Sequence, residues 1–336
     1  MRALVVTNMY PTDTHPGSGT FVADQVRSLK AAGADVELLF VDRPQGGRQA
    51  YRELAERTRN LVETHKPSLV HVMYGGVMAS IVTRAVHDRP VLVSFHGSDL
   101  LGTSRNGVIG TLSWRYGILS SRRAAARAAG IIVVSPVLLD ALPRRIDKSR
   151  VWIVPNGIDL ARFRPVERLE CQRVLGWDST RKHVLFPAPP GRPEKRFALA
   201  RASVEMLSKK GEHVDLHTLE NVPHEKVPVW LNAASAVLLT SSHEGSPTAV
   251  KEALACNVPV VSVDVGDVRE RITGIEGCFI TDAVVGDIAA KLDRALGRRE
   301  RIEARGRVEE FSLEQVAAKL LEIYGVVANR PLRTPT

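Results

Sequence analysis

The chain has 336 residues and a formal net charge of +9, and it is 44% hydrophobic, 25% charged and 5% aromatic. These proportions exclude a disordered or fibrous chain, and the length suffices for two domains that each bury a core of their own. No run of about 18 apolar residues occurs, so we expect no membrane span, and MRALVVTNMY reads as a first strand rather than a secretory signal.

The cysteines and the net charge indicate the cellular compartment and the classes of partner that the protein could bind. Cys171, Cys256 and Cys278 are far apart and form no Cys-x-x-Cys motif, so they read as reduced thiols of a cytoplasmic protein. The positive charge would suit a phosphorylated substrate, an anionic membrane face or nucleic acid. Nucleic acid is the least favoured, because basic residues are spread along the chain and no basic run is interleaved with aromatic residues.

Strands alternate with helical patterns through the first half of the chain. Apolar runs predict strands at residues 2–7, 35–41, 68–74, 90–95, 130–135 and 151–155. Helices are expected from Phe21 to Gly33, over about 49–65, after Gly76, and over a long stretch that ends at Ala129. This alternation predicts a parallel sheet covered on both faces, with ligands beyond the carboxyl ends of its strands.

Two segments follow predicted strands at positions that suit a ligand. The first strand leads into a loop containing Gly17-Ser18-Gly19, a geometry that lets backbone approach a phosphate, although a long surface loop is the alternative. It lacks the third glycine of G-x-G-x-x-G, which disfavours a dinucleotide site. His96 ends the strand at 90–95 in the string FHGSDL, where it either faces a ligand or serves the structure as most lone histidines do.

A basic helical pattern lies between Thr111 and Ala129. A solvated face over an alanine-rich packing face is the favoured interpretation. The functional alternative is attraction to an anionic membrane or to a phosphate-bearing acceptor. The residues concerned are Trp114, Arg115, Tyr116, Arg122, Arg123 and Arg127.

The second half begins with a strand at 183–188, followed by a cluster of cations. Arg192, Lys195 and Arg196 lie where a loop meets a helix, so the helix dipole and the cations together would hold a diphosphate. A solvated helix start is the alternative. The Asn156-Gly157 turn that precedes this half marks a domain boundary.

Residues 240–267 read as a strand end, an acidic loop, a helix and a second buried strand. We expect Ser246 to cap the helix, Pro247 to occupy its first position and Asn257 to end it in the left-handed conformation. Glu244 lies in the loop, and Glu252 lies in an apolar row where its carboxylate must find donors. The free N–H groups at the helix start form an anion site, unless this is an ordinary βαβ unit with a solvated Glu.

These motifs together resemble one family. Glu244-Gly245-Ser246-Pro247 followed by Lys251-Glu252-Ala253 resembles the E-x7-E signature of retaining, nucleotide-sugar-dependent glycosyltransferases with the GT-B fold, called family 4. The Gly17–Gly19 loop, the H-G-S-D string, Pro193-Glu194-Lys195 and the hinge at residues 155–163 resemble other motifs of this family. The resemblance spans about residues 1–327 and is greatest to bacterial members that build surface polysaccharides.

The resemblance implies two Rossmann-like parallel-sheet domains that face each other across a cleft. The acceptor domain would comprise residues 1–160 and a crossover helix at about 313–327, and the donor domain residues 166–312. The last residues of the chain, NRPLRTPT, are expected to fray.

The resemblance also implies the site. His96, Lys195 and Glu244 would serve catalysis, and Asp99 would orient His96 or bind acceptor. Glu252 would hold the ribose, beside a base-binding segment at Leu219, Glu220 and Val222. The donor phosphates would bind Gly17, Ser18, Gly19, Arg192, Lys195, Gly245, Ser246, Pro247 and Thr248.

The chain departs from the family pattern in two places. Prolines replace the usual Gly-Arg before Lys195, which leaves Arg192 and Arg196 as competing phosphate ligands. Thr248-Ala249 replaces a form that contains Asn, which leaves the donor sugar open.

The resulting hypothesis is a cytoplasmic, retaining, metal-independent glycosyltransferase without a cofactor. It would take a UDP- or GDP-linked sugar and a polysaccharide, lipid-linked or small-molecule acceptor in bacterial envelope synthesis, with peripheral association with an anionic membrane at its inner face. The alternatives are a nucleotide-sugar 2-epimerase of similar fold and a non-catalytic, basic protein that binds sugar or nucleic acid.

Overall fold

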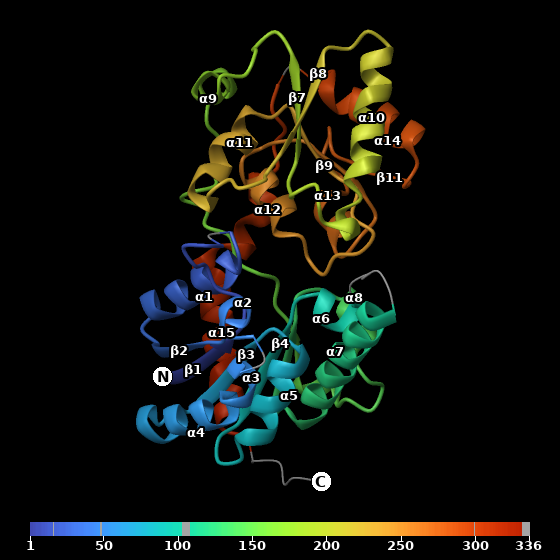
Figure 1. The fold of residues 1–336 in the computed structure, drawn as a ribbon. Coiled ribbons are helices and arrows are strands. Elements are labelled where there is room, and N and C mark those ends of the chain that lie inside the picture. Colours follow the sequence, from blue (N-terminus) through green and yellow to red (C-terminus); the bar gives the residue numbers. More distant parts are fainter. Residues whose placement is uncertain (16, 48, 103–107, 299, 331–336) are drawn as a thin grey trace. The chain divides into compact units, whose positions relative to one another are not determined.

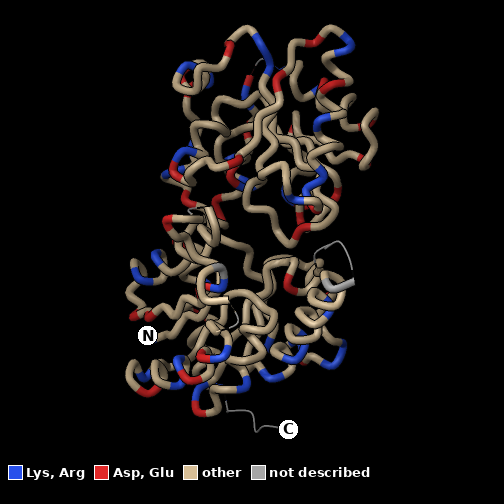
Figure 2. The backbone as a smooth tube through the Cα atoms, viewed as in Figure 1, with Lys and Arg blue, Asp and Glu red and all other residues tan. Residues whose placement is uncertain are grey.

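Two parallel β-sheets, each with helices on both faces, organise the chain in the computed structural model (Figure 1). The structure describes residues 1–15, 17–47, 49–102, 108–298 and 300–330. Residues 331–336, which belong to the tail that we expected to fray, lie outside this range. The chain divides into unit 1, Met1–Gly157 with Leu313–Thr336, and unit 2, Ile158–Ser312. Lys and Arg are spread over both units (Figure 2).

Unit 1 contains a six-stranded sheet of order β2-β1-β3-β4-β5-β6. Its strands are β1 (Arg2–Thr7), β2 (Asp35–Phe40), β3 (Leu69–Met73), β4 (Val91–Phe95), β5 (Gly130–Val133) and β6 (Val151–Ile153). The helices of unit 1 are α1 (Thr20–Ala31), α2 (Arg43–Gly46), α3 (Gln49–Arg52), α4 (Leu54–His65), α5 (Gly76–Ala85), α6 (Ser98–Leu101), α7 (Val108–Arg127), α8 (Val137–Ala141) and α15 (Leu313–Ala328).

The central strands of this sheet are apolar throughout because helices cover both of their faces. Every residue of β3, β4 and β5 is buried, as expected for a parallel sheet of this kind. One face packs on α5 and α7, and the other packs on α1 and α15. The C-terminal helix α15 therefore helps to cover one face of the first sheet, although it follows unit 2 in the sequence (Figure 1).

His71 is a polar residue in the middle of β3, and it joins three elements. Its Nδ1 lies 2.7 Å from the hydroxyl of Tyr324 on α15, and its Nε2 lies 2.6 Å from Oγ of Ser94 on β4. Burial lowers the pKa of His71 to about 3, so the ring stays neutral. Both ring nitrogens are thus satisfied without a buried charge, and α15 is fixed to the sheet.

Unit 2 contains a five-stranded parallel sheet of order β11-β10-β9-β7-β8. Its strands are β7 (Lys182–Phe186), β8 (Val214–Thr218), β9 (Ala236–Leu239), β10 (Val260–Val263) and β11 (Phe279–Thr281). The helices of unit 2 are α9 (Arg168–Leu175), α10 (Phe197–Lys209), α11 (Val227–Ala233), α12 (Thr248–Ala255), α13 (Val268–Ile272) and α14 (Val285–Leu296), with 3-10 turns η2 (Pro193–Lys195), η3 (His224–Lys226) and η4 (Arg305–Phe311).

Each sheet has one point at which the chain order reverses. In unit 1 this point lies between β1 and β3, and in unit 2 it lies between β7 and β9. The loops that leave two such strands run in opposite directions, which leaves a crevice at the carboxyl ends where ligands of open α/β sheets bind. The predicted fold of two parallel-sheet α/β domains is confirmed. Among the described helices, none is long and apolar enough to cross a membrane.

Candidate functional site

Two loops of unit 2 meet at the point where the strand order reverses. One follows β7 and ends in η2, and the other follows β9. Arg196 donates from Nε to the carbonyl of Thr240 at 2.5 Å and from a terminal nitrogen to the carbonyl of Ser241 at 2.8 Å. Thr240 in turn donates its hydroxyl to the carbonyl of Lys195 at 2.8 Å. These hydrogen bonds fix the two loops against each other.

Lys195 and Glu244 form an ion pair across this junction. Nζ of Lys195 lies 2.5 Å from Oε1 of Glu244, and the hydroxyl of Ser241 donates to the same oxygen at 2.7 Å. Side-chain exposures of 18% and 15% leave both groups within reach of a ligand. The carboxylate therefore holds the ammonium at the edge of the sheet, where a phosphate could bind to it.

The two arginines that were candidates for binding phosphate have different environments in the structure. The guanidinium of Arg196 is occupied by two main-chain carbonyls, and burial lowers the pKa of that group. Arg192 is 55% exposed and pairs with Glu194, with 2.6 Å between a terminal nitrogen and Oε1. Arg192 is thus the arginine that an incoming anion can reach, and Arg196 serves the loop.

The expected cap of the next helix was wrong. Helix α12 begins at Thr248, Pro247 is the cap residue and no side chain bonds to the helix start. The hydroxyl of Ser246 instead donates to Oδ2 of Asp267 at 2.9 Å. This bond holds the side chain toward Asp267, and its oxygen accepts from Nζ of Lys251 at 3.4 Å instead of from an N–H of the helix start. The N–H groups at the start of α12 consequently have no side-chain cap and remain suited to an anion. Asn257 does adopt the predicted left-handed conformation, with φ of 56°.

The loop after β10 packs against Gly245 through Gly266. Gly266 has φ of +57°, and a Cβ there would lie 2.6 Å from the carbonyl oxygen of Gly245. A side chain at residue 266 would displace Gly245, which lies three residues before the first residue of α12. The position of the Gly245–Thr248 segment therefore depends on residues 266 and 267.

Glu252 finds its donor on a neighbouring loop. Its side chain is 9% exposed, and Oε1 lies 3.3 Å from Nε2 of His224 in η3. A terminal nitrogen of Arg162 lies 3.1 Å from Nδ1 of the same ring. Arginine only donates, so Nδ1 accepts and Nε2 carries the proton toward Glu252. This relay orients the carboxylate, and His224 is a residue that the sequence did not single out.

The predicted base-binding segment leads into this relay. Leu219 and Val222 are half-buried against the core of unit 2, and Glu220 is exposed. Leu219 follows β8 directly and donates its N–H to the carbonyl of Phe186 at 3.3 Å. The segment thus lies at the carboxyl end of β8, and η3 joins it to Glu252.

In unit 1, Asp99 shapes the loop that carries His96. Its carboxylate accepts from the N–H groups of Gly75 at 2.8 Å, His96 at 3.0 Å and Gly97 at 2.9 Å. The residue is 6% exposed, and burial raises the pKa of the carboxyl. Of its two predicted roles, orientation of His96 is therefore favoured over contact with acceptor.

His96 and the Gly17–Gly19 loop are brought to one edge of the first sheet. The His96 ring lies 4.7 Å from the ring of Phe21 on α1 and stacks 6.2 Å from that of Tyr74. Gly19 has φ of +65°, and a Cβ there would lie 2.2 Å from the carbonyl carbon of Met9. Only glycine fits this close approach, so the loop after β1 turns into α1 beside His96.

Potential metal ligands are placed elsewhere. In the part of the chain that the structure describes, one group of His, Cys, Asp or Glu atoms is close enough to share an ion, namely His183, Asp215 and His217. His183 and Asp215 are the second residues of β7 and β8, and His217 is the fourth of the five residues of β8, whereas Lys195 and Glu244 follow the carboxyl ends of β7 and β9.

The comparisons with known proteins agree with this arrangement. A model described as Glycosyltransferase Family 4 matches residues 16–162, and one described as Glycosyl transferases group 1 matches residues 191–298. TuaC of Bacillus subtilis, named for a glycosyltransferase of teichuronic acid biosynthesis, is 26% identical over 332 residues, covering 80% of this chain and 82% of TuaC.

Solved structures are similar in fold at low identity. A sucrose-phosphate synthase from Thermosynechococcus elongatus gives a TM-score of 0.77 at 16% identity, covering 97% of this chain and 99% of that one. The UDP-GlcNAc 2-epimerase of Methanocaldococcus jannaschii gives 0.61 at 10% identity, covering 97% and 100%. This fold thus occurs in both transferases and an epimerase, and it does not by itself distinguish the two activities.

The two parallel-sheet units together with the two matching family models identify a glycosyltransferase of the GT-B class that uses nucleotide-sugar donors. The chain belongs to glycosyltransferase family 4.

Proposed function

We propose that the protein transfers a sugar, with retention of anomeric configuration and without a metal ion, from a nucleotide-diphosphate sugar to a hydroxyl acceptor. The observation that carries this proposal is the Lys195–Glu244 pair at the edge of unit 2. Arg192 lies three residues before Lys195, and the uncapped start of α12 follows Glu244 closely. Cations and N–H groups together suit a diphosphate leaving group.

The residues of unit 2 stabilise the charge that develops in the reaction. As the bond between the anomeric carbon and the leaving oxygen breaks, negative charge grows on the diphosphate, and Lys195 and Arg192 neutralise it. The acceptor hydroxyl attacks from the same side, and its proton passes to the leaving phosphate oxygen. Glu244 is bound by Lys195 and Ser241, so it positions the cation and the donor sugar instead of acting as a nucleophile.

The nucleotide binds beside the same edge. Glu252, oriented by His224, accepts from the ribose hydroxyls, and the segment at Leu219, Glu220 and Val222 lies against the base. The donor is a sugar linked to UDP or GDP. In unit 1, His96 contacts the transferred sugar and the Gly17–Gly19 loop lies near donor phosphate and acceptor, while Asp99 holds the His96 loop.

The acceptor belongs to bacterial envelope or exopolysaccharide synthesis, and it is a polysaccharide, a lipid-linked sugar or a small molecule. The similarity to TuaC supports this role. Helix α7 supports association with an anionic membrane, because it carries four arginines and no acidic residue along its 20 residues (Figure 2). Leu112, Tyr116, Leu119 and Arg123 are exposed and share one face of this helix.

The test of the transfer is a screen of nucleotide sugars by thermal shift, because a bound donor stabilises the native state. The stabilising donor is then incubated with candidate acceptors, and the product is examined by NMR for its anomeric configuration. Release of nucleotide diphosphate with retention supports the proposal. An inverted product contradicts the retaining mechanism, and stabilisation by no nucleotide sugar contradicts the donor class.

Membrane association has its own test. Cosedimentation with vesicles of anionic lipid is expected for the protein and is expected to weaken in Arg122→Glu/Arg123→Glu, with vesicles of neutral lipid as the control. Equal binding by the double variant, or equal binding to neutral vesicles, contradicts the role of α7.

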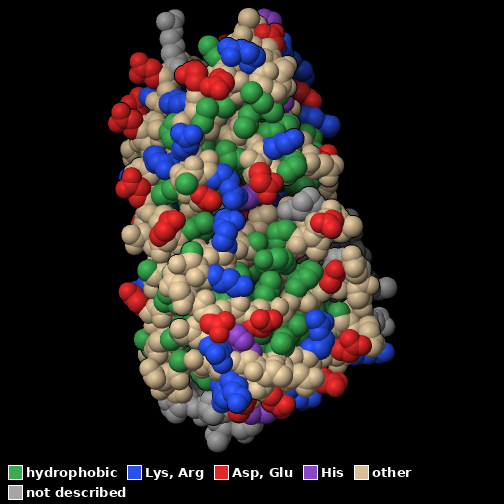
Figure 3. Space-filling model, turned by 90° about the vertical axis from the view of Figure 1, so that its left-hand side faces the viewer, with side chains coloured by type: hydrophobic (Ala, Val, Ile, Leu, Met, Phe, Trp, Pro, Cys, Tyr) green, Lys and Arg blue, Asp and Glu red, His purple; other side chains and the backbone are tan. Residues whose placement is uncertain are grey.

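The epimerase is the second candidate, favoured by the similarity to the solved 2-epimerase. Incubation of the donor alone, followed by analysis for the C2 epimer, separates it from a transferase. A non-catalytic, basic binding protein would show steep salt dependence and release no nucleotide diphosphate. On the face drawn in Figure 3, basic and acidic side chains are interspersed, which disfavours nucleic acid as the partner there.

A further inference from the structure

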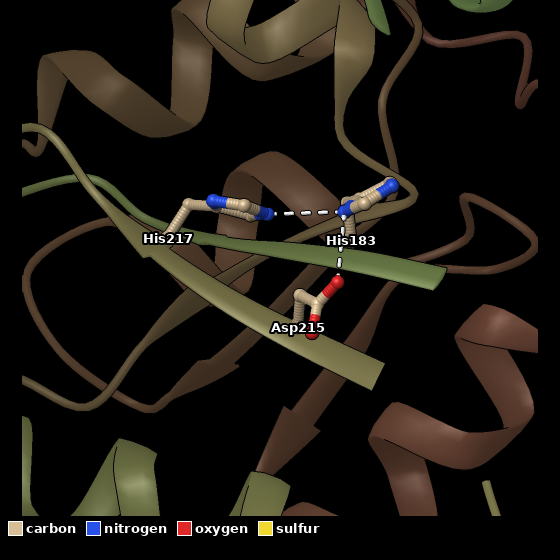
Figure 4. A group of neighbouring side chains, drawn as sticks. All are labelled: His183, Asp215 and His217. Atoms are coloured by element: carbon tan, nitrogen blue, oxygen red, sulfur yellow. Dashed lines mark hydrogen bonds and ion pairs between the residues drawn. The ribbon is translucent and has the colours of Figure 1, made fainter. Parts of the chain in front are cut away.

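Three side chains with metal-binding atoms share one face of the β7–β8 pair. His183 on β7 lies opposite Asp215 on β8 in the parallel register, and His217 follows Asp215 by two residues. Alternate side chains of a strand point to the same face, so all three converge (Figure 4). From this arrangement we propose that His183, Asp215 and His217 bind a divalent transition-metal ion of the Zn²⁺ class at a structural site of unit 2.

The distances suit one small ion. Nδ1 of His183 lies 3.0 Å from Nε2 of His217 and 3.8 Å from Oδ2 of Asp215, as the dashed lines of Figure 4 show. One ligand atom from each residue lies within 4.8 Å of the others. A tetrahedral ion with bonds of about 2.0–2.2 Å has ligand atoms roughly 3.3–3.5 Å apart. Small shifts of the side chains would therefore bring the three atoms to the separations that such an ion requires.

Neighbouring groups fix the ligand atoms in suitable orientations. Nε2 of His183 lies 2.8 Å from the carbonyl of Asp178, which can only accept, so the proton is on Nε2 and the lone pair of Nδ1 faces His217. A histidine ligand whose other nitrogen donates to a carbonyl is the usual arrangement at metal sites. Trp177 stacks on the His217 ring with 3.6 Å between centroids, which restricts that ring as well.

Arg181 orients the carboxylate and limits its charge. It donates to both oxygens of Asp215 at 2.7 Å, and its own side chain is 35% exposed. Each carboxylate oxygen keeps a further lone pair for an ion. Because the guanidinium is nearby, the net charge at the site is low, and this favours an ion held by neutral imidazoles, such as Zn²⁺, over Mg²⁺ or Ca²⁺, which require several charged oxygens.

The ligands of this site are not among the residues proposed to bind the diphosphate. His183 and Asp215 lie near the amino-terminal ends of β7 and β8 and His217 lies within β8, whereas the residues proposed to bind phosphate follow the carboxyl ends of β7 and β9. Asp215 is 36% exposed, so water can supply a fourth ligand. β8 is the edge strand of this sheet. The ion would thus clamp an edge strand to its neighbour and take no part in the chemical step.

The experiment measures Zn²⁺ binding to the full chain after treatment with a chelator. Calorimetry gives the affinity, and Co²⁺ substituted for Zn²⁺ gives a visible spectrum whose intensity reports four-coordination. His217→Phe keeps an aromatic ring on Trp177 and removes both nitrogens, and we expect it to weaken binding by about 100-fold or more. His213→Gln is the matched control, because His213 is exposed and lies two residues before Asp215.

Binding of one Zn²⁺ that survives in His213→Gln and is lost in His217→Phe supports the site. If Zn²⁺ raises the thermal midpoint of the unchanged protein and of His213→Gln but not that of His217→Phe, this supports the site independently. If His217→Phe does not fold, Asp215→Asn takes its place, with weaker binding of about tenfold or more expected. Absence of binding to the unchanged protein, or equal affinity in the ligand variants, overturns the proposal.

Discussion

The ammonium of Lys195 and the carboxylate of Glu244 lie 2.5 Å apart, although 49 residues separate them in the sequence. Lys195→Ala removes the cation that would neutralise the leaving diphosphate, and we expect turnover to fall by about 100-fold or more. The measurement is the steady-state release of nucleotide diphosphate. Lys209→Ala, an exposed lysine of α10, is the control with the same change in net charge. Turnover within about twofold of normal for Lys195→Ala would refute the assigned role.

Glu244→Gln tests the other half of this pair. Glutamine can still accept from Ser241, but it no longer attracts the ammonium, so Lys195 is less firmly held. We expect lower kcat with a folded protein whose thermal midpoint changes little, because partly exposed ion pairs contribute only about 1 kcal/mol or less to stability. A loss of thermal midpoint without a loss of kcat would show that the pair is structural.

Glu252→Ala is expected to weaken nucleotide binding. The carboxylate would lose its hydrogen bonds to the ribose, which for a charged acceptor are each worth about 1.5–3 kcal/mol, so affinity should fall by roughly tenfold or more. Calorimetry with the nucleotide diphosphate measures this directly. Glu225→Ala, at an exposed position next to His224, is the control. Unchanged affinity in Glu252→Ala would exclude the ribose role.

The sequence predicted the members of the donor site better than it predicted their contacts. Parallel strands share an edge at their carboxyl ends, so residues after β7 and β9 could be expected near one another. That β7 and β9 are direct neighbours depends on the strand order, which no local pattern contains. The roles of Lys195, Glu244 and Glu252 stay predictions, whereas their placement at this edge is now a finding.

The errors have tertiary causes. Ser246 has the residue type of a helix cap, but Asp267 lies 21 residues further along the chain and takes its hydroxyl. The link from Arg162 through His224 to Glu252 likewise joins residues far apart in sequence. Short helices such as α2 and α8 span four or five residues, too few to show a helical period. The predicted helix at about 49–65 is divided into α3 and α4.

Tyr324→Phe is expected to destabilise unit 1. The change removes the hydroxyl that pairs with Nδ1 of His71 and leaves a buried ring nitrogen without that partner, at a cost of about 1–3 kcal/mol. Chemical denaturation followed by circular dichroism measures the loss. Tyr116→Phe makes the same change at an exposed position of α7 and should leave stability unchanged. Equal stability of the two variants would mean that the hydrogen bond to His71 contributes nothing net.

Lys251 gives unit 2 a pH-dependent stability. The residue is 1% exposed, and burial lowers the pKa of its ammonium from 10.5 to about 8. Between these values the unfolded chain binds the proton and the folded chain does not, so the contribution of Lys251 to stability rises with pH through this window, by roughly 3 kcal/mol at most. Lys251→Met should remove this rise relative to Lys209→Met, an exposed control. Parallel pH profiles for the two variants would exclude a depressed pKa.

Donor turnover is expected to persist in the presence of EDTA. Lys195, Arg192 and the start of α12 supply the positive charge that a metal ion provides in other transferases. The initial rate of nucleotide diphosphate release is measured with chelator alone and again after Mg²⁺ is added back. Loss of the ion proposed at His183, Asp215 and His217 should lower the thermal midpoint without lowering the initial rate at 25 °C, because those residues are not among the residues proposed to bind the diphosphate. A rate abolished by EDTA and restored by Mg²⁺ would show that the diphosphate requires a metal ion, and would overturn the metal-independent mechanism.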